Sequence, residues 1–235
     1  MTDGSLYVLS AGAAKAVVNA TADAVRKSGG VVVVARFDAA GAIRARLVAG
    51  DPCDVVILPA PMLQALADEG WVERTSIASL GRVPTGIAVP EGAAHPAIGD
   101  APSLRETLER ASALYCPDVT HATAGIHFLR MLRDLEIADR LATRIHAHAN
   151  GAEAMAALAA AGDPAAIGCT QASEILYTPG VTLVAPLPEP FALTTDYRAA
   201  VAAASDHASV AREFCETLCG SQSNALRLQS GFLAG

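Results

Sequence analysis

The sequence predicts an α/β fold with two lobes, each of them a mixed, mostly parallel sheet flanked by helices. Strand-like and helix-like stretches alternate along the 235 residues, in two successive sets. The strand-like stretches are nearly unbroken apolar runs, as expected for strands that are covered on both faces. Alanine dominates the apolar residues and aromatic residues make up only 4% of the chain, a composition typical of α/β proteins.

The first set alternates strand and helix three times. The expected strands are 6–10, 31–37 and 54–59, and the expected helices are 13–28, 42–50 and 61–70. A further strand is expected at 82–90, followed by a loop rich in Pro, Gly and Ala at 90–102.

The second set begins with a helix at 103–111. Strands then follow at 113–117, 144–149 and 165–170, and helices at 124–135, 152–161 and 171–176. Two extended stretches separated by prolines occupy 179–205, and two final helices are expected at 208–219 and 221–230.

Charge and hydropathy narrow the possible partners. No apolar run approaches the roughly 18 residues of a membrane helix, so no membrane span is expected. The net charge of −7 argues against a nucleic-acid partner. Asp3 stands where a secretory leader carries a basic residue, which favours a cytoplasmic protein; a periplasmic location is the alternative if a natural precursor carries a leader.

Cysteine and histidine spacing predicts neither a metal nor a cofactor. The five cysteines form no CxxC pair, and most are interpreted as small core residues. His146 and His148 share one face of a strand, but the sequence places no third ligand beside them. The predicted partner is therefore a small anion held by the protein alone.

Helix starts after the strands are the candidate anion sites. Free backbone N–H groups and the positive end of the helix dipole meet there, so several such turns bind an anion with little help from lysine. An ordinary helix cap is the alternative interpretation of such a turn, because every helix start needs one. The candidate ligand-binding residues are Ser10, Gly12, Ala13, Ala39, Ala40, Gly41, Thr120, Thr123, Ala124, Gly125, Asn150, Gly151, Thr170 and Gln171.

Capping patterns single out particular residues in these turns. Asp38 is a possible cap before 42–50, Thr120 and Thr123 are possible caps before 124–135, and Asn150 with Glu153 matches a capping box. Lys15 is a cation in a first helical turn, where it opposes the dipole, so a functional reason is expected.

Three segments resemble a known family. At 123–132 (TAGIHFLRML), 167–188 (IGCTQASEILYTPGVTLVAPLP) and 48–58 (VAGDPCDVVIL) the chain resembles the molybdate-binding-protein family of type-2 periplasmic solute-binding proteins. The resemblance runs from the first strand to the terminal LQSGFLAG. It implies one lobe of 1–84 plus 196–235 and another of 85–195, joined by two crossing strands, with the ligand gripped between the lobes.

The resemblance also implies which turns hold the ligand. It places the ligand against Gly12, the turn 39–41, Ala124, Gly151 and Gln171. Molybdate binders of the family usually offer a serine in each of the first two turns, where this chain has glycine and alanines, and a tyrosine where it has Gln171. Each missing hydrogen bond costs about 1 to 3 kcal/mol, which argues against molybdate.

The segment QASEILYTPGV at 171–181 is similar to a side branch that includes aconitate isomerase. That similarity implies an organic polycarboxylate ligand and a 1,3-proton shift that moves a double bond. The proton carrier should titrate near neutral pH, so His121 is the first candidate, Lys15 the second and Cys116 the third; His127 is interpreted as a core residue.

Two further functions stay open at this point. One is a solute receptor that delivers an anion to the permease of an ABC transporter, since most relatives of this fold are receptors. The other is a ligand-sensing module like those fused to transcription regulators, although the chain shows no helix-turn-helix segment.

Overall fold

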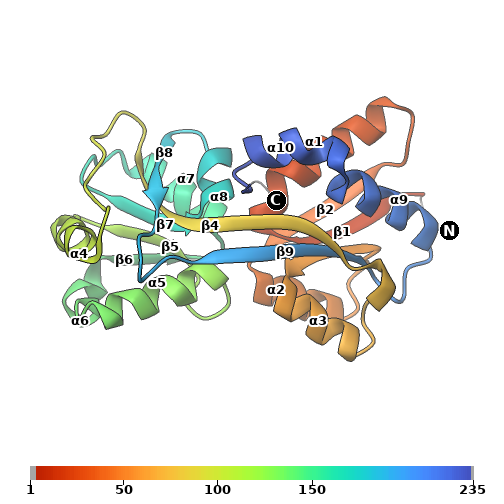
Figure 1. Cartoon of the computed structure of the whole chain (residues 1–235), viewed down its shortest axis with the longest axis horizontal. Coiled ribbons are helices and arrows are strands. Elements are labelled where there is room, and N and C mark those ends of the chain that lie inside the picture. Colours follow the sequence, from red (N-terminus) through yellow and green to blue (C-terminus); the bar gives the residue numbers. More distant parts are fainter. Residues whose placement is uncertain (1–3, 234–235) are drawn as a thin grey trace. The chain divides into compact units, whose positions relative to one another are not determined.

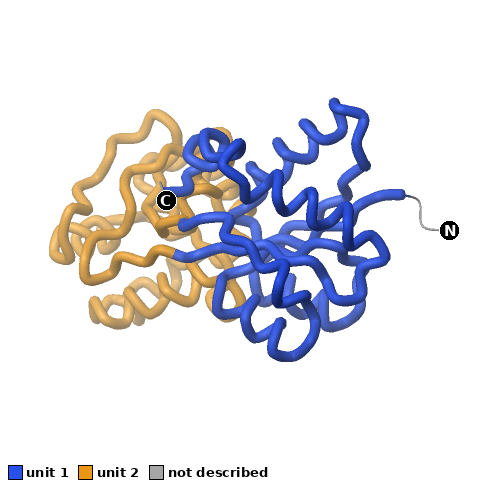
Figure 2. The backbone as a smooth tube through the Cα atoms, turned by 45° about the vertical axis from the view of Figure 1, so that its right-hand side comes forward, with its two compact units in different colours: residues 1–82, 195–235 blue, residues 83–194 orange. Residues whose placement is uncertain are grey.

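The computed structural model of the protein describes residues 4–233 and separates into two units (Figure 2). Unit 1 comprises the chain up to Arg82 and from Thr195 onward, and unit 2 comprises Val83–Thr194. The chain enters unit 2 within strand β4 (Ala78–Pro90) and leaves it at the start of β9 (Thr194–Val201). Unit 2 is therefore an insertion into unit 1.

Unit 1 is a sheet with the strand order β2-β1-β3-β9. Strands β1 (Leu6–Ala11), β2 (Val33–Asp38) and β3 (Val55–Pro59) are parallel, and β9 runs antiparallel to β3. All five residues of β3 are buried, because helices cover both faces of the sheet. The helices of unit 1 are α1 (Lys15–Lys27), α2 (Ala40–Val48), α3 (Ala60–Asp68), α9 (Ala208–Cys219) and α10 (Asn224–Gln229).

Figure 1 shows α1 and α9 over one face of this sheet and α2 and α3 over the other. Short 3-10 turns precede α1 at Gly12–Ala14 and α10 at Ser221–Ser223, and a third lies at Arg74–Ser76. The turn before α1 moves the start of that helix from the expected residue 13 to Lys15.

Unit 2 has the strand order β4-β7-β5-β6. Strand β5 (Leu114–Pro117) lies parallel to β6 (Ile145–His148) and β7 (Ile167–Gln171), whereas β4 runs antiparallel to β7 and to β8 (Val181–Pro186). Its helices are α4 (Ala101–Arg110), α5 (Thr123–Asp134), α6 (Ala138–Leu141), α7 (Gly151–Ala161) and α8 (Ala172–Tyr177), with a 3-10 turn at Ala142–Arg144.

Two apolar clusters hold the helices of unit 2 onto its sheet. Leu104 of α4 and Phe128 of α5 pack with Ile87 of β4 on one face. Met155 of α7 and Ile175 of α8 pack with Ala88 of the same strand on the other face. Since alternate residues of a strand point to opposite faces, β4 contributes to both clusters.

The predicted α/β class, with mixed sheets flanked by helices, is confirmed, although in unit 2 the parallel pairs β5–β6 and β5–β7 are matched by the antiparallel pairs β4–β7 and β4–β8. Strand β4 starts four residues before the expected residue 82, because Gly81, at φ 131°, hides the strand pattern. Helix α2 starts at Ala40 instead of residue 42, so Gly41 lies inside the helix and not in a turn. Between residues 4 and 233, none of the helices has the length and hydropathy to cross a membrane.

Candidate functional site

The carboxyl ends of β5, β6 and β7 meet at one edge of the unit 2 sheet. The three strands are parallel, with Pro117 beside His148 and Leu114 beside Ile167. Helices α5, α7 and α8 begin within a few residues of these strand ends. The predicted unit 2 ligand residues are thus brought together on three neighbouring turns, where parallel sheets commonly bind ligands.

The turn between β5 and α5 is organised by Asp118. Its Oδ1 accepts hydrogen bonds from the backbone N–H of Thr120 at 2.6 Å, from the N–H of His121 at 2.8 Å and from the Thr120 hydroxyl at 2.6 Å. These bonds, chiefly the one from the hydroxyl, hold the pKa of Asp118 well below its usual range. The turn therefore carries a permanently ionised carboxylate at neutral pH.

His121 lies on this turn with its side chain 65% exposed. Its Nδ1 is 2.7 Å from the Thr120 hydroxyl oxygen and 3.3 Å from Oδ1 of Asp118. In the tautomer whose Nδ1–H donates to Asp118, Nε2 is the free basic nitrogen. This carboxylate–imidazole arrangement orients a proton acceptor toward solvent or a ligand.

The start of α5 has no side-chain cap. Its N-cap residue is Ala122, so the expectation that Thr120 or Thr123 caps the helix is wrong: Thr120 is engaged by Asp118, and Thr123 is the first helical residue. The first-turn N–H groups of Thr123, Ala124 and Gly125 point out of the helix start with no capping side chain. They are donors suited to an anion.

Gly125 is required because the start of α5 packs closely against the turn that precedes it. A Cβ at this position would collide with the carbonyl oxygens of Pro117 and Asp118. The glycine therefore fixes the helix start against the Asp118 turn.

Asn150 caps α7, as predicted. Its side-chain oxygen accepts a hydrogen bond from the N–H of Glu153 at 3.0 Å, and its Nδ2 donates to the Glu153 carboxylate at 2.9 Å. Gly151, the first helical residue, has no room for a side chain, because Thr170 and Glu174 fill the space beside its Cα. The Thr170 hydroxyl donates to Oε2 of Glu174 at 2.6 Å.

The turn after β7 is polar and buried. Gln171 is 3% exposed and is the N-cap residue of α8, and it pairs in register with Thr85 of β4. The hydroxyls of Thr85 and Ser173 are buried and have no hydrogen-bond partner among residues 4–233. Because water or a ligand normally satisfies such groups, they mark this turn as a polar site.

The first turn of unit 1 offers backbone groups only. Ser10 is fully buried and its hydroxyl donates to the Ala11 carbonyl at 2.9 Å, so it is neither a cap nor a ligand donor. Gly12 and Ala13 lie in the 3-10 turn, whose N-cap residue, Ala11, has no capping side chain. The Nζ atom of Lys15 lies 5.8 Å from the centroid of the Phe37 ring, a cation–π contact that accounts for a cation in the first turn of a helix.

The second turn of unit 1 differs from the prediction. Asp38 does not cap α2; its Oδ1 accepts the N–H of Ala39 at 2.8 Å, and Ala39 itself is the N-cap residue. Ala39 and Ala40 are buried. Since Ala11 and Asp38 are in register at the carboxyl ends of β1 and β2, both unit 1 turns lie at the same sheet edge.

Cys116 lies in the core of unit 2 and is fully buried. Burial raises the pKa of its thiol to about 12, so the thiol stays protonated at neutral pH. The structure therefore removes Cys116 from the candidate proton carriers. His127, interpreted from the sequence as a core residue, is only half-buried, and its Nε2 lies 2.8 Å from the Phe191 carbonyl oxygen.

His146 and His148 both stack near Tyr115, at centroid distances of 5.1 and 6.0 Å. In the described part of the chain, residues 4–233, His, Cys, Asp and Glu side chains form no group of three or more that could hold a metal ion.

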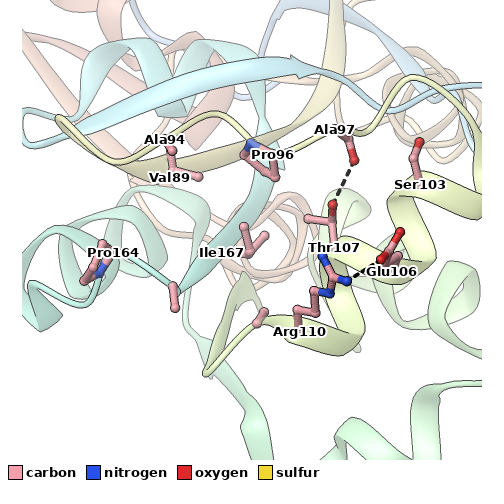
Figure 3. Close-up of a pocket in the computed structure, with 12 residues that line it drawn as sticks. Val89, Ala94, Pro96, Ala97, Ser103, Glu106, Thr107, Arg110, Pro164 and Ile167 are labelled. Carbon is pink, nitrogen blue, oxygen red and sulfur yellow. Dashed lines mark hydrogen bonds and ion pairs between the residues drawn. The ribbon is translucent and has the colours of Figure 1, made fainter.

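A separate pocket of about 280 Å³ lies within unit 2 (Figure 3). Helix α4 lines it with Thr107, whose hydroxyl donates to the Ala97 carbonyl, and with the ion pair of Glu106 and Arg110. The pocket reaches Ile167, the first residue of β7. The candidate ligand-binding turn after β7 lies at the other end of that strand, beside its last residue, Gln171. None of the predicted site residues lines it.

Glu174, Thr85, Ser173 and Asp118 were not predicted as site residues. Asp118 could have been found, because an aspartate two residues before a threonine is typical of an Asx turn. Glu174 gave a weaker signal, as the single charged residue in the stretch IGCTQASEIL at 167–176.

Replacing Asp118 with asparagine should lower stability in a pH-dependent way. The folded-state pKa lies below the ordinary value of 3.8, so the carboxylate stabilises the fold above that value, and the contribution disappears as the pH falls through the folded-state pKa. The side chain is 35% exposed, so the loss at pH 6 should stay below about 1 kcal/mol. Thermal unfolding of both proteins from pH 6 to pH 2 should show the gap closing; a constant gap would contradict this account.

This chain is similar to known proteins in both sequence and fold. A curated aconitate isomerase from a Pseudomonas species is 29% identical over 219 residues, covering 91% of this chain and 82% of that protein. The fold matches the periplasmic molybdate-binding protein of Azotobacter vinelandii, with a TM-score of 0.79, 17% identity and 98% and 99% of the two chains covered. It also matches the sulfate-binding protein of Mycobacterium tuberculosis, with a TM-score of 0.72, 20% identity and 97% and 86% coverage.

The resemblance inferred from the sequence is confirmed at the level of the family. The family model for bacterial extracellular solute-binding proteins matches residues 6–233, nearly the whole length. The chain is therefore a member of the bacterial extracellular solute-binding protein family, with the molybdate-binding-protein fold and a relative that is an aconitate isomerase.

Proposed function

We propose that this protein binds a small organic polycarboxylate and isomerises it by a 1,3-proton shift, as in the interconversion of cis- and trans-aconitate. The observation that carries the proposal is the ionised Asp118 that orients His121 beside the uncapped start of α5. Backbone N–H groups without a capping side chain and a proton acceptor thus lie close together along the chain, which supports the proposal. The aconitate isomerase relative supports this choice of substrate.

The 1,3-proton shift requires donors that hold a substrate carboxylate and a group that accepts and delivers a proton. The N–H groups at the start of α5 hold a substrate carboxylate, and Nε2 of His121 takes a proton from the methylene carbon. The electrons of the broken C–H bond form the new C=C bond as the old one shifts its electrons toward the third carbon and the adjoining carboxylate. The imidazolium, which exchanges its proton with water because the side chain is 65% exposed, then protonates that third carbon, so atoms and charge balance.

The turns after β1 and β2 lack the serines that the resemblance implies for molybdate binders, which supports an organic carboxylate over a stripped tetrahedral oxyanion. The Ser10 hydroxyl, near the end of β1, is buried and donates to the Ala11 carbonyl. Gly12, Ala39 and Ala40 offer no side-chain donor. Lys15 is the second candidate for the proton carrier.

A receptor function is the second candidate, because the family consists of extracellular solute-binding proteins. In that case the same turns bind the carboxylate without turnover, the partner is the permease of an ABC transporter, and the protein works in the periplasm. The isomerase function instead fits a cytoplasmic protein.

A proton NMR time course in heavy water separates these functions. Purified protein is mixed with trans-aconitate, and both the olefinic and the methylene signals are followed. We expect the cis isomer to appear with deuterium in its methylene group. Broadened ligand signals with no conversion would overturn the isomerase proposal in favour of the receptor, and an unaffected spectrum would overturn both for this ligand.

A further inference from the structure

The pocket of about 280 Å³ in unit 2 has an apolar floor (Figure 3). Val89, Ala111 and Ile167 line it, and all three are buried members of the apolar cluster that α4 and α5 share with the sheet. The volume is close to the lower end of the range for small-molecule pockets, about 300 to 1,000 Å³. An apolar group placed on this floor would leave water, which is the main source of affinity for such a group.

The walls of the pocket are fixed without a ligand. Pro96 lies in the loop between β4 and α4 and Pro164 in the loop between α7 and β7, and the proline rings fix the backbone φ at both points. The Thr107 hydroxyl of α4 donates to the Ala97 carbonyl at 2.8 Å, which ties the first of these loops to the helix. Binding therefore requires little ordering of the protein.

Among residues 4–233, the polar side chains that line the pocket all come from α4. The Ser103 hydroxyl donates to the Asp100 carboxylate at 2.6 Å, so its proton, like that of Thr107, is used within the chain. The other two side chains are Glu106 and Arg110, an ion pair at 2.6 Å that Figure 3 shows beside Thr107. A carboxylate has two oxygens and a guanidinium has five N–H groups, so both can also bond a ligand.

The ion pair determines which ligand charge the pocket favours. An anion beside it would be repelled by Glu106 and a cation by Arg110, and either would lose hydration on entry. A neutral molecule with an apolar ring and one hydroxyl avoids both costs. Its ring covers the floor, while its hydroxyl accepts a hydrogen bond from Arg110 and donates one to Glu106.

We propose that this pocket is a second binding site, for a small neutral molecule with an apolar ring and a single hydroxyl, such as a monocyclic aromatic alcohol. The pocket lies at the Ile167 end of β7, whereas the candidate polycarboxylate turn lies at the Gln171 end. The two sites are therefore separate, and the second does not depend on the proposed isomerase function.

An NMR titration that follows the backbone amides tests the site. The probes are benzyl alcohol, benzoate and benzylamine, which share a ring and differ in charge. We expect benzyl alcohol to shift the amide signals of residues 103–111 and 164–167 in a saturable way. It should bind about threefold or more tightly than either charged probe, the scale of an interaction with an exposed ion pair. Excess trans-aconitate should leave these shifts unchanged.

Variants of the ion pair test its role. Glu106→Gln leaves a net positive charge and should move the ratio of benzoate to benzylamine affinity toward benzoate by about threefold, and Arg110→Gln should move it the other way. Asp134→Asn and Arg130→Gln are the matched controls, because this pair has the same spacing on α5 and both arginine side chains are 78% exposed. The controls should leave the ratio unchanged.

A filling variant tests the location. Ala165 lines the pocket at an exposed position, so Ala165→Phe should occupy it and abolish the benzyl alcohol shifts. Ala161→Phe adds the same ring at the exposed last residue of α7, outside the pocket lining, and should retain them.

Each part of the inference can fail separately. Shifts confined to other residues, or no saturable shift at millimolar benzyl alcohol, overturn the site. Equal affinity for the three probes, or ion-pair variants that do not move the ratio in opposite directions, overturns the preference for a neutral ligand. Displacement by trans-aconitate overturns the separation of the two sites. Failure of trans-aconitate to bind anywhere counts against the proposed function and leaves this inference standing.

Discussion

Replacing His121 with alanine should lower the rate of aconitate isomerisation by about a hundredfold or more, since a positioned acid–base group typically contributes at least that much. Its Nδ1 lies beside the ionised Asp118, so Nε2 is oriented as the proton acceptor. The loss should appear in the rate constant for turnover, with little change in substrate affinity, because the α5 N–H groups remain. Initial rates from the olefinic NMR signals measure the effect.

His127→Gln is the matched control for His121→Ala. His127 lies on α5, the helix that follows the His121 turn, and its Nε2 lies 2.8 Å from the Phe191 carbonyl oxygen. It should retain wild-type turnover, with some loss of thermal stability. If His121→Ala turns over substrate at the wild-type rate, the proton carrier is another group, and Lys15 becomes the residue to replace.

Replacing Gly125 with alanine should destabilise the protein by about 2 kcal/mol, the usual scale for overpacking. The added methyl group would meet the carbonyl oxygens of Pro117 and Asp118, which are backbone atoms and cannot rotate away. Helix α5 must then shift against the turn, so ligand affinity should fall as well. Urea unfolding and calorimetric titration with trans-aconitate measure the two effects.

Gly99→Ala is the control for this substitution. A Cβ at residue 99 would meet no atom within 4 Å, and the residue does not have a left-handed φ. It should be neutral or slightly stabilising, because alanine restricts the unfolded chain. Equal stability of the two variants would show that the tight approach of α5 to its turn has no energetic importance.

The sequence predicts the elements well where the periodic pattern is long. Helix α9 has the bounds expected for 208–219, and α7 begins one residue before the expected 152. The short helix α6, at 138–141, was missed because four residues are too few to show a helical period. The helix start that shifted most is that of α10, by three residues, because a 3-10 turn occupies Ser221–Ser223.

The site was predictable in outline only. Strand ends and glycines locate the turns, because turn chemistry is local. The roles of Ser10, Cys116 and Glu174 depend instead on burial and on partners in other segments. Gly151 shows the difference most clearly: it was expected to give a ligand access to the backbone, and in the structure it gives room to Thr170 and Glu174.

The insertion of unit 2 between β4 and β9 has a consequence for biosynthesis. During translation, every strand of unit 2 leaves the ribosome before β9, the antiparallel partner of β3. Domains generally fold as units as they emerge, so unit 2 can complete its sheet while the sheet of unit 1 still has an open edge at β3. That exposed apolar edge is the nascent chain's main aggregation hazard, and it persists until the last strand is made.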